Sequence, residues 1–376
     1  MTVVGQDSFA WLRDIAWPFW LEHGIDRRSR AFHEHLRHED AACGADFRRL
    51  RVVTRQITVF GEAAVLGLEG AADAVALGLA FLDRHAGNPD TGYAWRFDLA
   101  GRIVDDRRDL YDHAFVLLAL AKAAPALPAR AFALHERAVR LDAYLQSWFR
   151  HPLGGYVESL PETLPRRQNP HMHLFEAYLA AYEAFGAPVF LARADELAAL
   201  MLDRLFQWAE GALPEYFTED LAPLREAGRF VVEPGHHAEW VWLLDWHDRL
   251  GGTVQPRAGA AMAALLRFLD AHGIHPRTGA LVDELWSDGT VKAAGSRLWP
   301  QTEYLKAELV RPDADPARAA RVEAMLMSYV ANARPGLWFE RRSEDGRFSD
   351  EAAPASSLYH LTGAITLAYR RATATP

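Results

Sequence analysis

Apolar side chains recur at helical spacing along nearly the whole chain. In residues 8–23, for example, Phe9, Leu12, Ile15, Ala16 and Phe19 fall on one face of a helix. Runs that alternate with the period of two typical of strands are almost absent. The pattern predicts twelve helices, several of which begin on a proline, as a first helical position allows. Their expected ranges are 8–23, 47–68, 71–85, 109–123, 128–148, 169–185, 188–208, 234–250, 256–272, 300–310, 316–331 and 355–371.

The breaks between the predicted helices are also repetitive. After every second helix a glycine precedes apolar or aromatic residues, at Gly92, Gly155, Gly211, Gly279 and Gly336. These glycines are 63, 56, 68 and 57 residues apart. A period of this size indicates stacked helical hairpins joined by short β-like loops.

Six such hairpins predict an all-α (α/α)6 barrel, formed as a single domain from residues 1–376. The even-numbered helices would form the inner wall and the odd-numbered helices the outer wall. An open helical solenoid is the alternative architecture. Solenoids need polar terminal caps, and the sequence shows none, which favours the closed ring.

Composition and charge exclude several classes of protein. The net charge of −9, without a cluster of Lys and Arg, argues against a nucleic-acid surface. The single cysteine, Cys43, excludes an internal disulfide framework and fits a reducing compartment. The N-terminus lacks the pattern of a signal peptide, and no apolar run is long enough to cross a membrane. We therefore expect a cytoplasmic enzyme or binding protein, without a membrane partner.

Distinctive polar and aromatic residues gather at the starts of the even-numbered helices. They are Arg55, Tyr111, Asn169, His173, His236, Glu239, Trp299, Glu303 and His360. If the ring closes, all these helix starts meet at one mouth of the barrel. The three-residue spacing places His236 and Glu239 on the same helix face.

The segment 167–177 is the clearest of these starts. Asn169 is expected to cap the helix, with Pro170 at its first position. His173 then lies one turn into the helix on the face of Asn169 and Glu176, whereas His171 points away. Because the positive end of the helix dipole disfavours imidazolium, a histidine here should stay neutral and able to accept a proton.

Each residue also has a purely structural interpretation. Arg55 would pair with a surface carboxylate, Tyr111 and His360 would fill the core, and Trp299 would cover the barrel end. Carboxylates such as Glu239 and Glu303 are favoured in first helical turns in any case. The recurrence of the pattern in all six even-numbered helices favours a shared site.

Three kinds of chemistry compete for these residues. A catalytic metal would use the spacing of Glu233, His236 and Glu239, but no second such group occurs on another inner helix. Glycoside hydrolysis would need two facing carboxylates, such as Glu239 and Glu303, and would leave three histidines unused. Cofactor-free proton transfer uses the histidines directly, because imidazole titrates near neutral pH.

Four segments resemble the N-acylglucosamine 2-epimerase superfamily, within it most closely the branch of mannose isomerases and related aldose–ketose isomerases. They are residues 169–177, 233–240, 299–303 and 356–361. The resemblance implies an (α/α)6 barrel that needs neither a metal nor another cofactor. It also implies sugar isomerisation or 2-epimerisation through an enediol. The family's functional residues fall on Arg55, Tyr111, Asn169, His173, His236, Glu239 and His360.

We therefore expect interconversion of D-mannose and D-fructose, by a monomer or homodimer whose partner is a monosaccharide. His236 and His360 are the candidates for proton transfer and ring opening, His173 for the sugar hydroxyls or the second face, and Glu239 for orienting or charge-stabilising a histidine. The remaining substrate-binding candidates are Arg55, Tyr111, Asn169, Trp299 and Glu303. A sugar 2-epimerase and a non-catalytic sugar-binding repeat protein are the alternatives.

Overall fold

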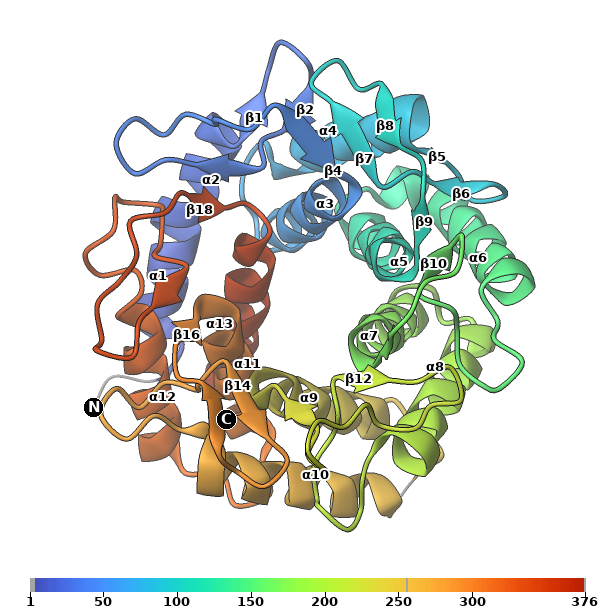
Figure 1. The fold of residues 1–376 in the computed structure, drawn as a ribbon. Coiled ribbons are helices and arrows are strands. Elements are labelled where there is room, and N and C mark those ends of the chain that lie inside the picture. The colour runs from blue at the N-terminus through green and yellow to red at the C-terminus, as the bar shows by residue number, and fades with distance from the viewer. Residues whose placement is uncertain (1–3, 255, 375–376) are drawn as a thin grey trace.

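The computed structural model describes residues 4–254 and 256–374, and its helices form two concentric walls (Figure 1). The outer wall contains α1 (Gln6–Trp11) with α2 (Trp17–His23), α4 (Ala71–Phe81), α6 (Ala131–Trp148), α8 (Pro188–Leu200), α10 (Arg257–Phe268) and α12 (Pro316–Met327). The inner wall contains α3 (Leu50–Val65), α5 (Leu110–Ala126), α7 (Gln168–Phe185), α9 (Pro234–Arg249), α11 (Leu298–Val310) and α13 (Ser357–Ala374). The last inner helix, α13, packs against the first, α3, so the ring closes. The predicted (α/α)6 barrel and its inner and outer walls are confirmed, and the open solenoid is excluded.

Short irregular turns continue several outer helices. Single π-helical turns occupy Leu12–Ala16, Leu82–Ala86, Met201–Leu205 and Leu269–Gly273, and a 3-10 turn, Pro128–Arg130, precedes α6. Two inner helices begin earlier than predicted, α7 at Gln168 and α11 at Leu298. Pro170 and Pro300 therefore lie inside the first turn. Their missing N–H groups still cost nothing there, because the first four N–H groups of a helix have no intrahelical partner.

Short antiparallel strands join the helices at one end of the ring. They are β1 (Ile25–Asp26), β2 (Ala31–Phe32), β3 (His35–Leu36), β4 (Phe47–Arg49), β5 (Gly87–Asn88), β6 (Gly92–Tyr93), β7 (Arg96–Asp98), β8 (Ile103–Asp105), β9 (Arg108–Asp109), β10 (Ser159–Leu160), β11 (Arg166–Arg167), β12 (Tyr216–Phe217), β13 (Val231–Val232), β14 (Glu284–Trp286), β15 (Val291–Ala293), β16 (Ser296–Arg297), β17 (Arg341–Arg342) and β18 (Ala353–Pro354). They pair as β1–β2, β3–β18, β4–β7–β8, β5–β6, β9–β10, β11–β12, β13–β14–β15 and β16–β17. The pairing of β3 with β18 joins the two ends of the chain at this rim.

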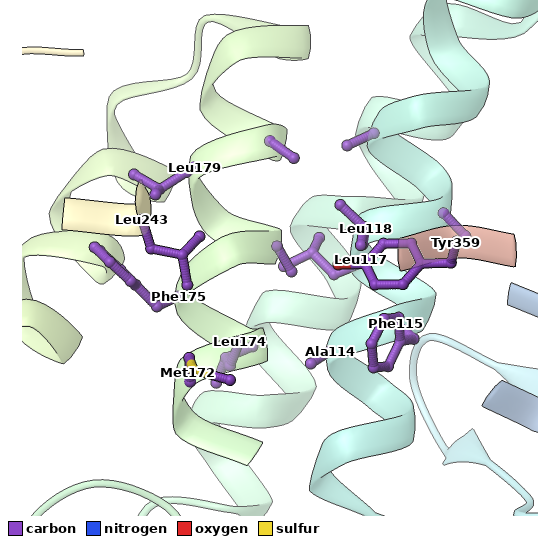
Figure 2. Close-up of a cluster of buried hydrophobic side chains, with 14 of the residues drawn as sticks. Ala114, Phe115, Leu117, Leu118, Met172, Leu174, Phe175, Leu179, Leu243 and Tyr359 are labelled. Atoms are coloured by element: carbon purple, nitrogen blue, oxygen red, sulfur yellow. The ribbon is translucent and has the colours of Figure 1, made fainter. Parts of the chain in front are cut away.

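Apolar side chains fill the spaces between neighbouring inner helices. Figure 2 shows buried apolar side chains at the contact of α5 with α7, among them Ala114 and Leu117 of α5 and Leu174 of α7, while Phe115 lies beside Tyr359 of α13. Such packing holds the inner wall rigid, so polar groups at the helix starts keep fixed positions. Among the described residues, no helix combines the length and the apolar character needed to cross a bilayer.

Side chains of the next inner helix hold four of the loops that contain the repeated glycines. After Gly155, which has φ +67, the backbone N–H of Tyr156 donates to His171 Nε2 at 3.0 Å. A Cβ at Gly155 would lie 2.7 Å from that nitrogen, so the position requires glycine. Three more loops repeat the bond, from Tyr93 to His113, from Leu213 to His237 and from Leu281 to the Gln301 amide oxygen. His171 therefore points away from the mouth, as predicted.

Candidate active site

Five inner helices place a candidate or aromatic residue at the same position near their start, and α13 adds His360 to the same cluster. The position lies five residues after the first residue of the helix in α3, α5, α7, α9 and α11. It holds Arg55, Phe115, His173, Glu239 and Glu303, respectively. In α13 the corresponding residue is His360, five residues after Ala355. Neighbours in this set contact one another around the axis. The Arg55 guanidinium lies 4.2 Å from the Phe115 ring centre, which lies 4.7 Å from the His173 ring centre. His173 Nδ1 lies 3.7 Å from Glu239 Oε1. The fold thus gathers candidates that are far apart in the sequence.

His360 is held by a buried ion pair on α11. Its Nδ1 lies 2.9 Å from Glu303 Oε1, and Glu303 Oε2 accepts from Lys306 Nζ at 2.6 Å and from Trp242 Nε1 at 2.7 Å. Burial alone would raise the pKa of Glu303, but the Lys306 ammonium and His360 lower it to about 2. Burial lowers the pKa of His360 to about 4, and the cations of Arg55 and Lys306 oppose the effect of Glu303. His360 is therefore neutral near pH 7, with its Nδ1–H donated to a carboxylate.

A second carboxylate on α7 holds His173. Its Nδ1 lies 3.0 Å from Glu176 Oε2, and Glu176 Oε1 accepts a short hydrogen bond from the Tyr359 hydroxyl. Burial lowers the pKa of His173 to about 4 even though Glu176 opposes it, so this imidazole is also neutral. Glu239 lies beside the pair, and no described group forms a hydrogen bond to either of its oxygens. Burial and the nearby Glu303 carboxylate raise the pKa of Glu239 well above its ordinary value. Glu176 thus makes the closer contact to His173, and Glu239, whose Oε1 lies 3.7 Å from the same nitrogen, stays a candidate for charge stabilisation.

His236 lies in a more acidic environment than the other two. Its Nδ1 is 2.9 Å from Glu215 Oε2 and 3.9 Å from Glu233 Oε2. Burial alone would lower the pKa of His236, but these two carboxylates outweigh it and hold the pKa above its ordinary value. The expected fall in histidine pKa at a helix start is wrong for His236. For His173 and His360 the direction is right, but burial is the largest cause.

Trp299 lies between the two histidines proposed for proton transfer. Its ring centre is 4.8 Å from that of His236 and 5.8 Å from that of His360. The indole approaches α9 closely, and a Cβ at Gly235 would lie 2.8 Å from it. A residue with a side chain at Gly235 would therefore displace the ring.

Arg55 and Tyr111 form a donor pair on the other side of the axis. Arg55 Nη2 donates to the Tyr111 hydroxyl at 2.5 Å, and Nη1 lies 3.5 Å from the Ser356 carbonyl oxygen. The predicted cap at Asn169 is wrong, because α7 starts at Gln168, whose N–H donates to the Glu215 carbonyl at 3.3 Å. No described group bonds the buried Asn169 Oδ1.

Two groups of side chains at the mouth have the donor atoms of a metal site. In each of the groups His173–Glu176–Glu239 and Glu215–Glu233–His236, one ligand atom from every residue lies within 4.8 Å of the others. In the second group protein donors already use both carboxylates, since Arg297 Nη2 donates to Glu233 Oε2 at 2.8 Å and Gln168 Nε2 to Glu215 Oε2 at 3.0 Å. A cation in the second group would have to displace the Arg297 guanidinium from Glu233.

A cavity of about 440 Å³ lies further along the barrel, toward the C-terminal ends of the inner helices. Glu176, Lys306, Tyr359 and Trp242 form part of its wall. Each of the four forms a hydrogen bond or ion pair described above with one of the histidines or carboxylates of the candidate site. The candidate site and the cavity therefore share one layer of residues.

Sequence reasoning missed several residues of this arrangement. Helical spacing had placed Glu176 on the face of His173, but no role was assigned to it, and Lys306, three residues after Glu303, could have been found by the same spacing. Trp242 lies three residues after Glu239 and offered the same signal. Glu215 lies in the loop before α9 and carried no local signal, because the fold brings it to His236.

Comparisons with known proteins agree with this architecture. The sequence model of the N-acylglucosamine 2-epimerase (GlcNAc 2-epimerase) family matches residues 31–364. A protein named mannose-6-phosphate isomerase from Rhizobium meliloti (strain 1021) is 37% identical over 368 residues, which cover 94% of each chain. One named D-mannose isomerase from Thermobifida fusca is 33% identical over 203 residues, which cover 48% of this chain and 49% of the relative.

Solved structures share the same fold. A crystal structure of D-mannose isomerase superposes with a TM-score of 0.85 at 21% identity, over 97% of this chain and 98% of the other. Cellobiose 2-epimerase from Bacillus thermoamylovorans B4167 gives a TM-score of 0.85 at 18% identity, over 97% and 99% of the two chains. The chain therefore belongs to the N-acylglucosamine 2-epimerase family and is an isomerase that acts on sugars.

Proposed function

We propose that this isomerase interconverts D-mannose and D-fructose through a cis-enediol(ate), with histidines as the acid and base and without a metal. One observation carries the proposal. His236 and His360 lie on either side of Trp299. The Nδ1 of each contacts a carboxylate, and within the described residues the Nε2 of neither has a protein partner. Two imidazoles with unbonded nitrogens beside one aromatic ring suit proton transfer to and from a sugar carbon. The names of the two relatives above support mannose as the substrate.

The two histidines suit different steps. His360 is neutral near pH 7, so its Nε2 is the candidate base for the C2 proton of the open-chain aldose. Transfer of that proton to C1 of the enediolate, on the same face, together with passage of the O2 proton to O1, gives the 2-ketose. His236 is held protonable by Glu215 and Glu233, which suits proton donation to the ring oxygen during ring opening.

Arg55 and Tyr111 are the candidate donors for the enediolate oxygens, where negative charge develops. Arg55 is bonded only to a hydroxyl and a carbonyl oxygen among the described groups, so its positive charge is not cancelled by a carboxylate contact. Asn169 Oδ1, which has no partner among the described groups, is a candidate acceptor for a sugar hydroxyl. His173 and Trp299 remain candidates for contact with the sugar hydroxyls and the apolar face of the sugar.

We also propose that the preferred substrate carries no phosphate, although one relative is named for a phosphorylated sugar. Four arginines beside the inner-helix starts already pair with carboxylates, Arg49 with Glu34, Arg51 with Asp112, Arg167 with Glu158 and Arg297 with Asp283 and Glu233. A phosphate dianion is usually bound by arginines that are free to form bidentate bonds. The one positive charge of Arg55, which no carboxylate of the described residues contacts, matches one enediolate oxygen better than a phosphate dianion.

NMR of the protein with D-mannose in heavy water tests these proposals. Fructose labelled at C1 supports the isomerase, whereas glucose labelled at C2 would identify a 2-epimerase. A parallel assay with mannose 6-phosphate should give at least about tenfold lower kcat/KM, and the reverse preference would refute the unphosphorylated substrate. His236→Ala and His360→Ala should each abolish measurable turnover. Near wild-type turnover of both variants on every hexose tested would refute the histidine mechanism.

A further inference from the structure

Acidic residues in the loops form hydrogen bonds to the residues just before the inner helices. In three loops the carboxylate accepts from the backbone N–H of the arginine just before the next inner helix and from the Nε of the same arginine. The pairs are Glu34 with Arg49, at 2.6 and 2.7 Å, Glu158 with Arg167, at 2.7 and 2.8 Å, and Asp283 with Arg297, at 2.8 and 2.9 Å. Each acid is thus neutralised by the arginine whose backbone it caps.

The loop before α9 breaks this repeat at one residue. Glu215 is the acid of this loop, and its Oε1 accepts at 3.3 Å from the backbone N–H of the residue just before α9. That residue is Glu233, where the other three loops have arginine. Glu233 cannot neutralise Glu215, and its own carboxylate accepts from Arg297 instead. Glu215 Oε2 is therefore left for His236.

Neighbouring side chains orient the Glu215 carboxylate. Gln168 Nε2 donates to Glu215 Oε2 at 3.0 Å, and the amide orientation of Gln168 is set by Trp240, whose Nε1 donates to Gln168 Oε1 at 2.8 Å. Glu215 and His236 are both only 3% exposed. A buried carboxylate in this position accepts the Nδ1–H of His236, which fixes the tautomer and aims the Nε2 lone pair or proton at the mouth.

We propose that Glu215 is the positioning residue for His236, fixing its ring and keeping it able to carry a proton during turnover. The role exists because glutamate replaces arginine at position 233 and leaves Glu215 free. This inference rests on the proposed function only for its kinetic consequences. The geometry of the pair is independent of the sugar.

The charges around His236 set the expected pH behaviour. Glu215 from the loop and Glu233 at the start of α9 raise the pKa of His236, while Arg297 at the start of α11 lowers it. The neighbouring His173 and His237 are kept neutral mainly by burial. Removing the Glu215 charge should therefore lower the pKa of His236 and move the basic limb of the pH–kcat profile to lower pH.

The test compares Glu215→Gln with Glu158→Gln in the full-length protein. Both changes keep side-chain shape and remove one carboxylate of the same structural repeat. We expect E215Q to lower kcat at least about tenfold, with a smaller change in KM, and to shift the basic limb. We expect E158Q to keep kcat within about threefold and to leave the limb in place. Equal effects in the two variants would reduce Glu215 to a loop-stabilising residue and overturn the proposal.

Two further measurements separate this inference from the proposed function. The ¹⁵N NMR titration of His236, assigned with His236→Ala, needs no substrate, and it should show a lower pKa in E215Q than in the wild type. An unchanged titration would overturn the proposal whatever sugar the enzyme uses. If E215Q does not fold, Glu215→Asp keeps the charge with a shorter reach and should place the His236 pKa between its ordinary and wild-type values. A wild-type titration in E215D with a wild-type pH profile would show that the close contact is dispensable.

Discussion

Lys306 should control whether Glu303 can support His360. Its Nζ lies 2.6 Å from Glu303 Oε2 and 3.9 Å from the centre of the Trp242 ring, and both partners of the ion pair are buried. Lys306→Met keeps most of the side-chain volume and removes the charge. The buried Glu303 carboxylate then loses the cation that contributes most to its low pKa.

The magnitude follows from Coulomb's law. At 2.6 Å and an effective dielectric constant of about 20, the attraction is about 6 kcal/mol. At 1.36 kcal/mol per pKa unit this corresponds to roughly 4–5 units as an upper bound. The pKa of Glu303 would then rise from about 2 toward neutrality, so more of the carboxyl is protonated at the acid end of the assay range. Protonated Glu303 holds the Nδ1–H of His360 poorly, and the acid limb of the activity should move toward neutral pH.

The assay is kcat against pH for K306M and for Lys122→Met. Lys122 is the matched control, because its Nζ also lies over an indole, 5.7 Å from the Trp246 ring centre, and lines the same cavity. It forms no ion pair with a described residue. We expect K306M to lose about 10- to 100-fold in kcat at pH 6 and less at pH 8, and K122M to stay within about twofold. An unchanged acid limb in a K306M protein that folds, as judged by circular dichroism, would refute this reasoning.

Four shorter predictions follow from other contacts. Glu239→Gln mimics the neutral acid implied by the raised pKa of Glu239, so it should leave kcat within about fivefold, whereas Glu303→Gln should lower it at least about 100-fold; steady-state assays at pH 7 compare them, and equal losses would contradict a neutral Glu239. The pH–kcat profile should fall in acid as His360, with a pKa of about 4, becomes protonated, and in base as His236, with a raised pKa, loses its proton; an acid limb at or above pH 6.5 would disprove the assignment of His360 as the neutral base. Activity should survive exhaustive treatment with EDTA, and loss of activity that only Zn²⁺, Mn²⁺ or Co²⁺ restores would establish a metal-dependent mechanism instead. His171→Leu removes the acceptor of the Tyr156 N–H and should destabilise the fold by about 1–3 kcal/mol, while His171→Gln, which copies Gln301, should cost less; urea unfolding measures both, and the opposite order would count against the repeat.

Helical spacing and the repeated glycines were enough to predict the barrel. Both signals are local, because a helix face depends on residues three and four apart and a positive φ depends on one residue. Distinctive polar and aromatic residues occur at the starts of every second helix, and this alternation predicted which helices form the inner wall. The candidate residues on the inner wall were likewise visible, since a closed ring brings equivalent positions of successive hairpins to one mouth.

Contacts between segments distant in sequence decided the rest. The start of α7 moved from Asn169 to Gln168, whose N–H pairs with a carbonyl at Glu215. The pKa of His236 rises because the fold places Glu215, 21 residues away in the chain, against its Nδ1. Burial, which no local pattern measures, raises the pKa of Glu239 and lowers the pKa of His173 and His360. The residue types at the mouth were thus a property of the sequence. Their protonation depends on desolvation and on charges at a few ångströms, and only the tertiary structure supplies those distances.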